Sequence, residues 1–310
     1  MEEENETTLT EFILIGYSGH PKTRIGLIIL MSAVYSVTLT GNSLIILVTI
    51  ADPRLHNPMY FFLCNLSILD VGYSTSSIPQ AIANLLVDRP TMPFARCYFQ
   101  MNSGAYLAVT ECFLLAIMAY DRYIAISRPL HYMLVMSKKF CIQLAVVTWT
   151  SGFFLGVLPI CVMPARFCGN NVIDHMTCEL KAVMKLICTD NSLNQLVTFI
   201  TGSLTLLGPF AFILFSYLRI LVAILRIHSS GGRLKAFSTC ASHLTVVTIF
   251  YGTFIFSYLQ PQTKTTRDLD KVVSLFYGIV TPMLNPLIYT LRNQEVIGAL
   301  RRLVRSKGNL

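Results

Sequence analysis

Charged residues are scarce in this chain, at 13% of 310 residues, whereas 54% are hydrophobic. Soluble domains carry roughly a quarter of charged residues, so this composition excludes an ordinary soluble protein. The same excess of apolar residues excludes intrinsic disorder. Nine cysteines are too few for a disulfide-built scaffold. A net charge of +8 without a dense basic run does not indicate a nucleic-acid partner. The composition instead predicts a polytopic membrane protein.

Motifs that bind phosphate or zinc, or that present a nucleophilic serine, are also missing from the sequence. We therefore predict no enzyme activity and no required cofactor. The first 20 residues lack a basic start followed by an apolar run, so no cleavable signal peptide is predicted. The first apolar segment is expected to act as its own insertion signal.

Seven apolar segments interrupt the polar sequence, and each reaches the roughly 20 residues that a membrane-crossing helix needs. They cover residues 25–51, 58–87, 97–120, 140–165, 191–218, 236–263 and 272–291. The sequence therefore predicts an all-α membrane protein, a seven-transmembrane helix bundle over residues 25–291. Residues 1–24 would form an N-terminal tail, and residues 292–310 a C-terminal tail.

The orientation of the bundle follows from the basic residues. If the N-terminus is outside, the inner segments hold 14 of the 24 lysines and arginines, which agrees with the positive-inside rule. Asn5 begins a glycosylation sequon, which requires the lumenal side. The cysteines at residues 97, 168, 178 and 188 fall at or beside outer loops, where disulfides persist. We therefore expect an extracellular N-terminus and a cytoplasmic C-terminus.

Two acidic residues, Asp70 and Glu111, lie near the middle of the second and third segments. Ionisable groups are costly within a membrane and usually functional. Because these segments contain no basic partner, the two carboxylates need a cation or a proton. One interpretation is a sodium site or a carboxyl that stays protonated. The alternative is a pair of polar anchors that pack against Asn42, Ser67 and Asn285.

Three local patterns indicate helices that move. Asp121-Arg122-Tyr123 stands where the third segment meets the cytoplasm. The seventh segment contains Asn285–Tyr289 with a proline inside it, and the fifth contains Pro209 before Tyr217. A proline inside a helix frees a carbonyl and loosens the helix. These patterns predict a conformational switch.

Longer motifs show a specific resemblance. They are LHNPMYFFL at Leu55–Leu63, MAYDRYIAI at Met118–Ile126, PLHY at Pro129–Tyr132, KAFSTCASH at Lys235–His243 and PMLNPLIYTLRN at Pro282–Asn293. In these motifs the chain resembles the rhodopsin-like G-protein-coupled receptors, and specifically the vertebrate olfactory (odorant) receptors. Together with Gly41-Asn42, the motifs spread over almost the whole chain.

The resemblance implies roles for individual residues. It implies one disulfide between Cys97 and Cys178 and a second between Cys168 and Cys188. It also implies an activation and G-protein-contact region at the inner ends of the helices. The residues assigned to that region are Asp121, Arg122, Tyr123, Tyr217, His243, Asn285, Pro286 and Tyr289.

The family's odorant site lies between the outer halves of the third, fifth, sixth and seventh segments. The matching residues here are Gly104, Ala105, Ala108, Val109, Cys112, Thr198, Thr201, Gly202, Thr205, Tyr251, Phe254, Ile255 and Tyr258, with Glu179 from an outer loop. Tyr251 takes the place of the tryptophan found in other rhodopsin-like receptors. The resemblance therefore implies that it is a toggle beneath the ligand.

The chemistry of these side chains limits the ligand independently. Small residues leave volume, and aromatic residues supply apolar contact area. The helical candidates include no charged group, so a charged ligand would lack a counter-ion. Thr201, Thr205 and Tyr258 each offer one hydrogen bond. We therefore predict a small, neutral, mostly apolar ligand such as an alcohol, ketone, aldehyde or ester. Glu179 leaves a basic ligand open as the alternative.

The function implied by the resemblance is a population shift driven by an odorant, in which the inner end of the sixth segment moves outward. The expected partners are the odorant, the stimulatory olfactory G protein that raises cyclic AMP, and the lipid bilayer. The expected location is the plasma membrane, in the cilia of olfactory neurons.

Two rival interpretations are weaker. A proton- or sodium-coupled transporter would use Asp70 and Glu111 as its relay, but the sequence lacks the inverted repeats typical of transporters. His175-Met176-Thr177-Cys178-Glu179 fits a copper-binding pattern suggested for these receptors. If Cys178 forms a disulfide, however, it has no thiolate to offer a metal.

Overall fold

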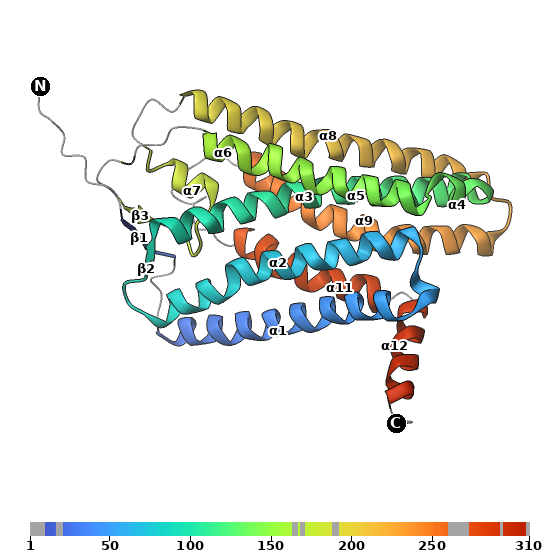
Figure 1. The fold of residues 1–310 in the computed structure, drawn as a ribbon, viewed down its shortest axis with the longest axis horizontal. Helices are drawn as coiled ribbons and strands as arrows, with labels where there is room; N and C mark the ends of the chain where they lie inside the picture. Colours follow the sequence, from blue (N-terminus) through green and yellow to red (C-terminus); the bar gives the residue numbers. More distant parts are fainter. Residues whose placement is uncertain are drawn as a thin grey trace, which may run out of the picture.

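The computed structural model describes residues 10–16, 21–162, 167, 171–187, 192–259, 273–291 and 294–307. These residues are mostly helical, and the long helices run side by side along one axis (Figure 1). The bundle contains α1 (Pro21–Ala51), α2 (Pro58–Leu86), α3 (Phe94–Ser127), α5 (Lys138–Gly152), α6 (Leu158–Val162), α8 (Ser192–Leu225), α9 (Ser230–Leu259) and α11 (Thr281–Leu291). In the described part of the chain, five helical stretches are long and apolar enough to cross a membrane.

Two of the membrane helices contain a wider turn. Residues Phe153–Val157 form the π-helical segment η3, which joins α5 to α6, and Phe276–Val280 form η4, which leads into α11. Wider turns of this kind are frequent at functional sites. Gly156 in η3 lies so close to α3 that a Cβ atom there would be 2.9 Å from the carbonyl oxygen of Ala105. A larger residue would therefore separate these two helices.

The inner connections are short and well capped. The 3-10 helix η1 (Pro53–Leu55) begins at Asp52, whose side chain accepts a hydrogen bond from the backbone N–H of Arg54. Asn57 caps α2 in the same way, through the N–H of Tyr60, and Pro58 follows it at the first helical position. After α3, the short segments η2 (Pro129–His131) and α4 (Tyr132–Val135) lead into α5. The helix α3 runs seven residues beyond the predicted membrane span.

A small sheet closes the outer end of the bundle. Strand β1 (Glu11–Leu14) lies between β2 (Thr91–Pro93), which is antiparallel to it, and β3 (Val172–Ile173), which is parallel. Phe12 and Leu14 of β1 are buried with Met92 and Ile173 in a separate outer core. Residues 1–24 were predicted to form an N-terminal tail, and a strand within them was not predicted. The short helix α7 (Leu180–Met184) lies in the same outer region (Figure 1).

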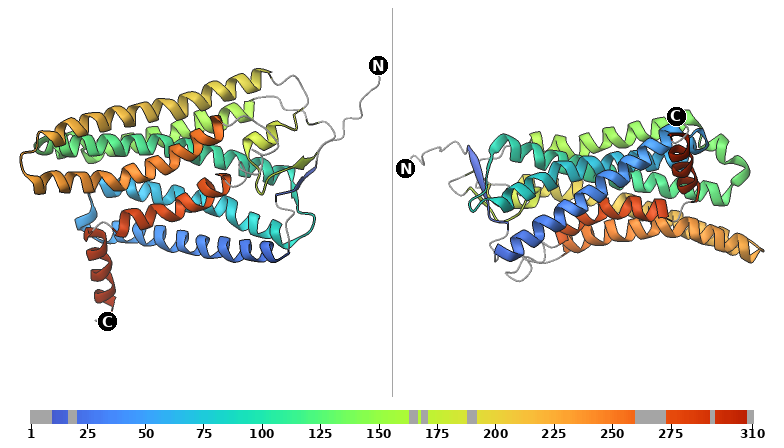
Figure 2. Two further views of the ribbon diagram at one scale, coloured as in Figure 1. Left: turned by 180° about the vertical axis from the view of Figure 1, so that it is seen from behind. Right: turned by 90° about the horizontal axis from the view of Figure 1, so that it is seen from below.

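The helix α12 (Gln294–Lys307) leaves the opposite end and runs across the direction of the bundle (Figure 2). Arg302 donates a hydrogen bond of 3.0 Å from Nε to the carboxylate of Asp52. This hydrogen bond, together with the N–H of Arg54, holds the pKa of Asp52 below its ordinary value. Tyr60, which is fully buried, donates a hydrogen bond of 2.8 Å to Glu295. Two polar contacts therefore fix α12 to the first inner loop and to α2.

Candidate functional site

A cavity of about 200 Å³, called the main cavity below, lies between the outer halves of α2, α3, α8, α9 and η4 under the second outer loop. Most of the predicted ligand residues line it. They are Gly104, Ala105, Ala108, Val109, Cys112, Glu179, Thr198, Thr201, Gly202, Thr205 and Phe254. The folded chain therefore brings these residues, from four separate segments, around one space.

Three predicted ligand residues differ from this group. Tyr251 is buried below the main cavity, where its hydroxyl donates a hydrogen bond of 3.1 Å to the carbonyl oxygen of Cys112. Its ring packs on that of Phe210, with centroids 4.9 Å apart. Ile255 packs against the central core and does not line the main cavity. The side chain of Tyr258 lies outside the described residues. Tyr251 thus contacts the backbone of a residue in the cavity wall.

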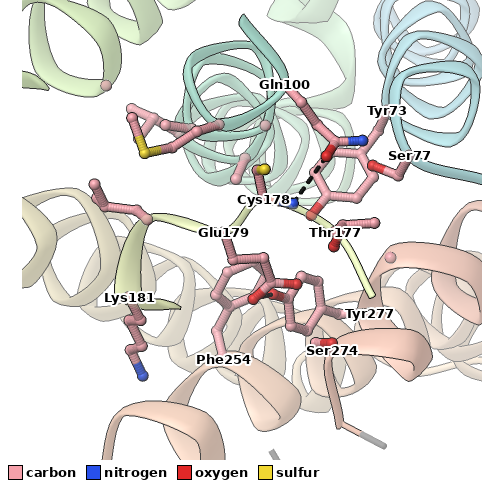
Figure 3. A pocket seen from close by; sticks show the side chains of 18 of the residues that line it. Tyr73, Ser77, Gln100, Thr177, Cys178, Glu179, Lys181, Phe254, Ser274 and Tyr277 are labelled. Atoms are coloured by element: carbon pink, nitrogen blue, oxygen red, sulfur yellow. Dashed lines mark hydrogen bonds between the residues drawn. The ribbon is translucent and has the colours of Figure 1, made fainter. Parts of the chain in front are cut away.

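The outer end of the main cavity contains more polar groups than the sequence predicted, since only Glu179 was expected there from the outer loops. Figure 3 shows Tyr277 against Glu179, and the tyrosine hydroxyl donates a hydrogen bond of 2.7 Å to that carboxylate. Ser274 lies 3.1 Å from Nε2 of His175. Lys181 also lines the cavity and donates a hydrogen bond of 2.8 Å to the carbonyl oxygen of Ser257. Both signs of charge are therefore present at this end.

Sequence reasoning also missed the contribution of α2. Tyr73 and Ser77 line the main cavity (Figure 3), although only the third, fifth, sixth and seventh segments were expected to do so. No ligand residue was predicted in the seventh segment, although Tyr277 in η4 and Ser274, two residues before η4, line the cavity. The polar serines and tyrosines within otherwise apolar spans were the available signal for these positions.

A disulfide holds the second outer loop over the main cavity. Cys97 and Cys178 are bonded, with Cα atoms 5.3 Å apart, which confirms the predicted pair. Gln100 reinforces the link, because its side chain accepts a hydrogen bond of 2.8 Å from the N–H of Cys178 and donates one to Ser76 (Figure 3). The bonded Cys178 offers no thiolate to a copper ion. The predicted pair Cys168 and Cys188 and the sequon at Asn5 lie outside the described residues.

The two membrane carboxylates occupy a buried polar region below the main cavity. Asp70 accepts two hydrogen bonds, of 3.0 and 3.1 Å, from the side-chain nitrogen of Asn285. Asn42 donates to the carbonyl oxygen of Pro282, which links α1 to α11. Oε1 of Glu111 and Oδ1 of Asn285 are buried without a partner in the described part of the chain. The region therefore combines structural anchoring with unused oxygen atoms that suit a cation or a proton.

A histidine joins three helices at the inner end of the bundle. Nε2 of His243 in α9 lies 3.1 Å from the carbonyl oxygen of Leu115 in α3, and Nδ1 lies 2.7 Å from the hydroxyl of Tyr217 in α8. A carbonyl only accepts hydrogen bonds, so Nε2 carries the proton. Burial disfavours a charged ring, and in the neutral ring Nδ1 then accepts from Tyr217. The sequence-predicted switch residues Tyr217 and His243 are therefore in direct contact.

The other predicted switch residues make separate contacts near the inner half of the bundle. Asp121 accepts a hydrogen bond of 2.7 Å from the hydroxyl of Tyr132 in α4. Nε of Arg122 and the hydroxyl of Tyr289 are buried without a partner among the described residues. Tyr123 packs against the cluster between α8 and α9. Pro286 lies against α1, where a Cβ on Gly41 would be 3.0 Å away.

Comparison with known proteins shows which family the chain belongs to. The family model described as "Olfactory receptor" matches residues 31–307. Human olfactory receptor 13H1 is 48% identical over 301 residues, which cover 97% of this chain and 98% of the relative. Human olfactory receptor 13C9 is 47% identical with 98% of each chain covered. The olfactory receptor-like protein OLF3 of Canis lupus familiaris is 45% identical, with 97% and 95% covered. The chain therefore belongs to the olfactory receptors: it is a multi-pass membrane protein with the seven-transmembrane fold, a non-enzymatic G-protein-coupled receptor that senses odorants.

Proposed function

We propose that the main cavity binds a small, neutral, mostly apolar odorant, and that the loaded receptor activates the stimulatory olfactory G protein to raise cyclic AMP. The lining of the cavity carries this proposal. Its walls contain Gly104, Ala105 and Ala108 on one side and Phe254 on another. Its volume is below the roughly 300–1,000 Å³ of sites for drug-sized ligands, which favours a small molecule. Family membership supports a ciliary plasma-membrane location.

The threonines of α8 narrow the ligand chemistry further. Thr201 donates its hydroxyl proton to the carbonyl oxygen of Val197 at 2.7 Å, and Thr205 donates to that of Thr201 at 2.8 Å. Each hydroxyl has a single proton, so while these intrahelical bonds are kept its oxygen offers a ligand an acceptor. An odorant that donates a hydrogen bond, such as an alcohol, therefore suits these positions better than a ketone or an ester.

A basic ligand is the second candidate, because Glu179 lines the main cavity. Two features of the main cavity argue against a basic ligand. The carboxylate already accepts a hydrogen bond from Tyr277, and Lys181 on the same loop brings a positive charge to the cavity. A cationic ligand would approach both charges, whereas a neutral alcohol avoids the cost of desolvating an ion.

The proposed signal passes from the cavity to the inner end. The hydroxyl of Tyr251 is hydrogen-bonded to the carbonyl oxygen of Cys112 in the cavity wall, and Tyr251 belongs to the same helix as His243. Outward movement of the inner end of α9 from α3 must break the bond from His243 to Leu115. An odorant that binds the moved arrangement better would shift the population toward it. The moved helix would open a site for the G protein beside Arg122.

The experiment is a cyclic AMP assay in cells that express the receptor with the olfactory G protein. Neutral alcohols of small size should give dose-dependent responses, and amines should not. Ala108→Trp should abolish the response because the indole fills the cavity, whereas Val146→Trp, on the lipid-exposed side of α5, should preserve it. Arg122→Ala should abolish signalling at normal surface expression. Activation by amines alone would move recognition to Glu179, and a normal response in Ala108→Trp would reject the cavity.

We also propose that Asp70 and Glu111 hold a sodium ion or share a proton. The buried oxygens of Glu111 and Asn285 without partners among the described residues support this proposal. A bound ion stabilises the state that binds it. The melting temperature of purified receptor should therefore rise in sodium chloride relative to choline chloride at equal ionic strength. Glu111→Gln should remove the increase, and Asp88→Asn, at an exposed loop acid, should retain it. If sodium has no effect but Glu111→Gln stabilises the receptor, the proton interpretation is the correct one.

A further inference from the structure

A second cavity, called the side cavity below, lies at the outer end of the receptor and has a volume of about 410 Å³. The outer ends of α1 and α2, the first outer loop and strands β1 and β3 surround it. Most of its wall is apolar, from Leu14, Ile15, Leu85, Val87 and Val172. Its volume falls within the range of small-molecule sites.

The two cavities share a wall. Ala81 of α2 and Met176 of the second outer loop line both of them. Met176 is buried and packs with Met31 and Ile78 in the cluster between α1 and α2. A methionine side chain is unbranched and adopts many shapes at low cost. A single flexible side chain, beside a small alanine, therefore stands between the side cavity and the main cavity.

The backbone of Met176 is fixed although its side chain is adaptable. Asn84 donates a hydrogen bond of 3.1 Å to the carbonyl oxygen of Met176. On the other side, Gly16 lies so close that a Cβ there would be 2.7 Å from Cα of Met176. The chain after β1 and the end of α2 thus clamp this residue. Only the side chain can change position without displacing one of these segments.

Three of the four side chains with polar or charged groups that line the side cavity, Arg24, Asn84 and Asp88, are engaged in hydrogen bonds or an ion pair; the fourth is Arg89. Arg24 donates hydrogen bonds to the carbonyl oxygens of Leu85 and Val87 and pairs with Asp88 at 2.9 Å. The amide of Asn84 donates to Met176 and accepts a hydrogen bond of 2.8 Å from Gln80. A ligand with a charge would compete with these contacts. A neutral apolar molecule would leave all of them intact and cover the apolar wall.

We propose that the side cavity is a second, transient binding site for small neutral apolar molecules, placed in series with the main cavity, with the Met176 side chain as the gate between them. The choice of ligand class rests on the proposed function, since the ligand of the main cavity has the same chemistry. An odorant would occupy the side cavity first and pass to the main cavity when Met176 turns aside.

Thiol labelling of the full-length receptor in lipid nanodiscs tests the connection without any signalling assay. The probe is hexyl methanethiosulfonate, which is neutral and apolar. The native Cys112 is buried and lines the main cavity, so its labelling rate, read by mass spectrometry of its peptide, reports arrival there. Met176→Ala should raise this rate by about tenfold, within the decades over which substitutions change association rates. Met31→Ala should not, because Met31 belongs to the same cluster but lines neither cavity.

A second substitution tests whether the route runs through the side cavity. Val87→Trp, which fills only the side cavity, should reverse the gain of Met176→Ala by about tenfold. Leu86→Trp, at the preceding residue, which lines neither cavity, should leave the faster labelling of Met176→Ala unchanged. If labelling of Cys112 is the same with and without the tryptophan at position 87, the cavities are not in series and the proposal is wrong.

A third arm keeps the native Met176 and measures occupancy directly. In Val87→Cys, octan-1-ol should slow labelling of the new cysteine by hexyl methanethiosulfonate. The same alcohol should not protect Thr91→Cys, at an exposed position on β2 outside both cavities. Equal protection at both positions, or none at position 87, would overturn the site. If the labelling experiments give the expected results but no odorant activates the receptor, the proposed function is wrong and this inference still holds.

Discussion

His243 illustrates how much a single residue determines in this receptor. It receives one hydrogen bond from Tyr217 in α8 and gives one to the backbone of α3, so three helices meet at one ring. The ring is buried and neutral in this arrangement, and it has no spare hydrogen-bonding atom. Any outward movement of α9 leaves at least one of the partner groups without its bond.

The substitution His243→Phe should raise basal signalling. It removes both hydrogen bonds and leaves buried polar partners unsatisfied, which costs roughly 1–3 kcal/mol. If this cost falls on the resting arrangement, the fraction of active receptor rises on the order of tenfold for each 1.4 kcal/mol. The measurement is odorant-free cyclic AMP divided by surface expression. Thr245→Val is the control, because Thr245 is exposed on α9 and bonds within its own helix. Unchanged basal signalling in His243→Phe would show that the contact does not restrain α9.

Among the secondary structure elements, α12 is held by two polar contacts in addition to Val296 and Ala299, which are buried in the central core. The pair between Arg302 and Asp52 fixes it to the first inner loop, and Tyr60 holds it through Glu295. The carboxyl of Asp52 has its pKa below the ordinary 3.8, first because Arg302 bonds to it and second because the N–H of Arg54 does. A lowered pKa means that this stabilisation is complete above the ordinary pKa and is lost only as the pH falls through the lowered one.

The docking of α12 should therefore be independent of pH between 5 and 8, a range that lies above the ordinary pKa of aspartate. A spin label at Arg301→Cys, an exposed position on α12, measures its mobility. Arg302→Ala should increase the mobility at every pH in this range. Lys138→Ala, at an exposed base at the start of α5, should not. Mobility that rises between pH 8 and pH 5 in the unsubstituted receptor would contradict the assigned role of Asp52.

The strand β1 has only four residues, but it contributes buried side chains to the outer core. Phe12 is buried against the rings of Phe94 and Phe167, with centroids 5.8 and 5.7 Å away. Phe12→Ala should cost about 3–5 kcal/mol locally, as for other buried phenylalanines. Hydrogen exchange should accelerate in Glu11–Leu14, Thr91–Pro93 and Val172–Ile173 together. Ile15→Ala, at a half-exposed position just after the strand, is the matched control. Faster exchange in β1 alone would show that the three strands do not form one cooperative unit.

At the scale of the whole molecule, the sequence predicted the bundle because lipid leaves few alternatives. A span must satisfy its own backbone hydrogen bonds, so each long apolar run becomes a helix. The disulfide between Cys97 and Cys178 was also predicted correctly, although from family resemblance. Most predicted ligand residues line one cavity, and they too were predicted from family resemblance.

Other features depend on contacts that no single segment encodes. The strand β1 has only four residues, and it forms because β2 and β3 provide partners on both sides. Tyr73 and Tyr277 line the main cavity because of how α2 and η4 are rotated in the bundle. An apolar span has little periodicity to reveal that rotation, since lipid and core favour similar side chains. Tyr251 was predicted both as a ligand residue and as a toggle beneath the ligand; it does not line the main cavity, and its hydroxyl donates a hydrogen bond to the backbone of Cys112 in the cavity wall.

The position of β1 has a consequence for the synthesis of the receptor. Ile13 pairs with Thr91 and with Val172, so the strand is synthesised well before both of its partners. Closing such long loops is slow compared with local helix formation. The strand β1 therefore remains an unpaired edge in the lumen until α3 has been inserted and the second outer loop has been synthesised. Early folding factors in that compartment would meet the receptor first through this strand, before any part of its odorant site exists.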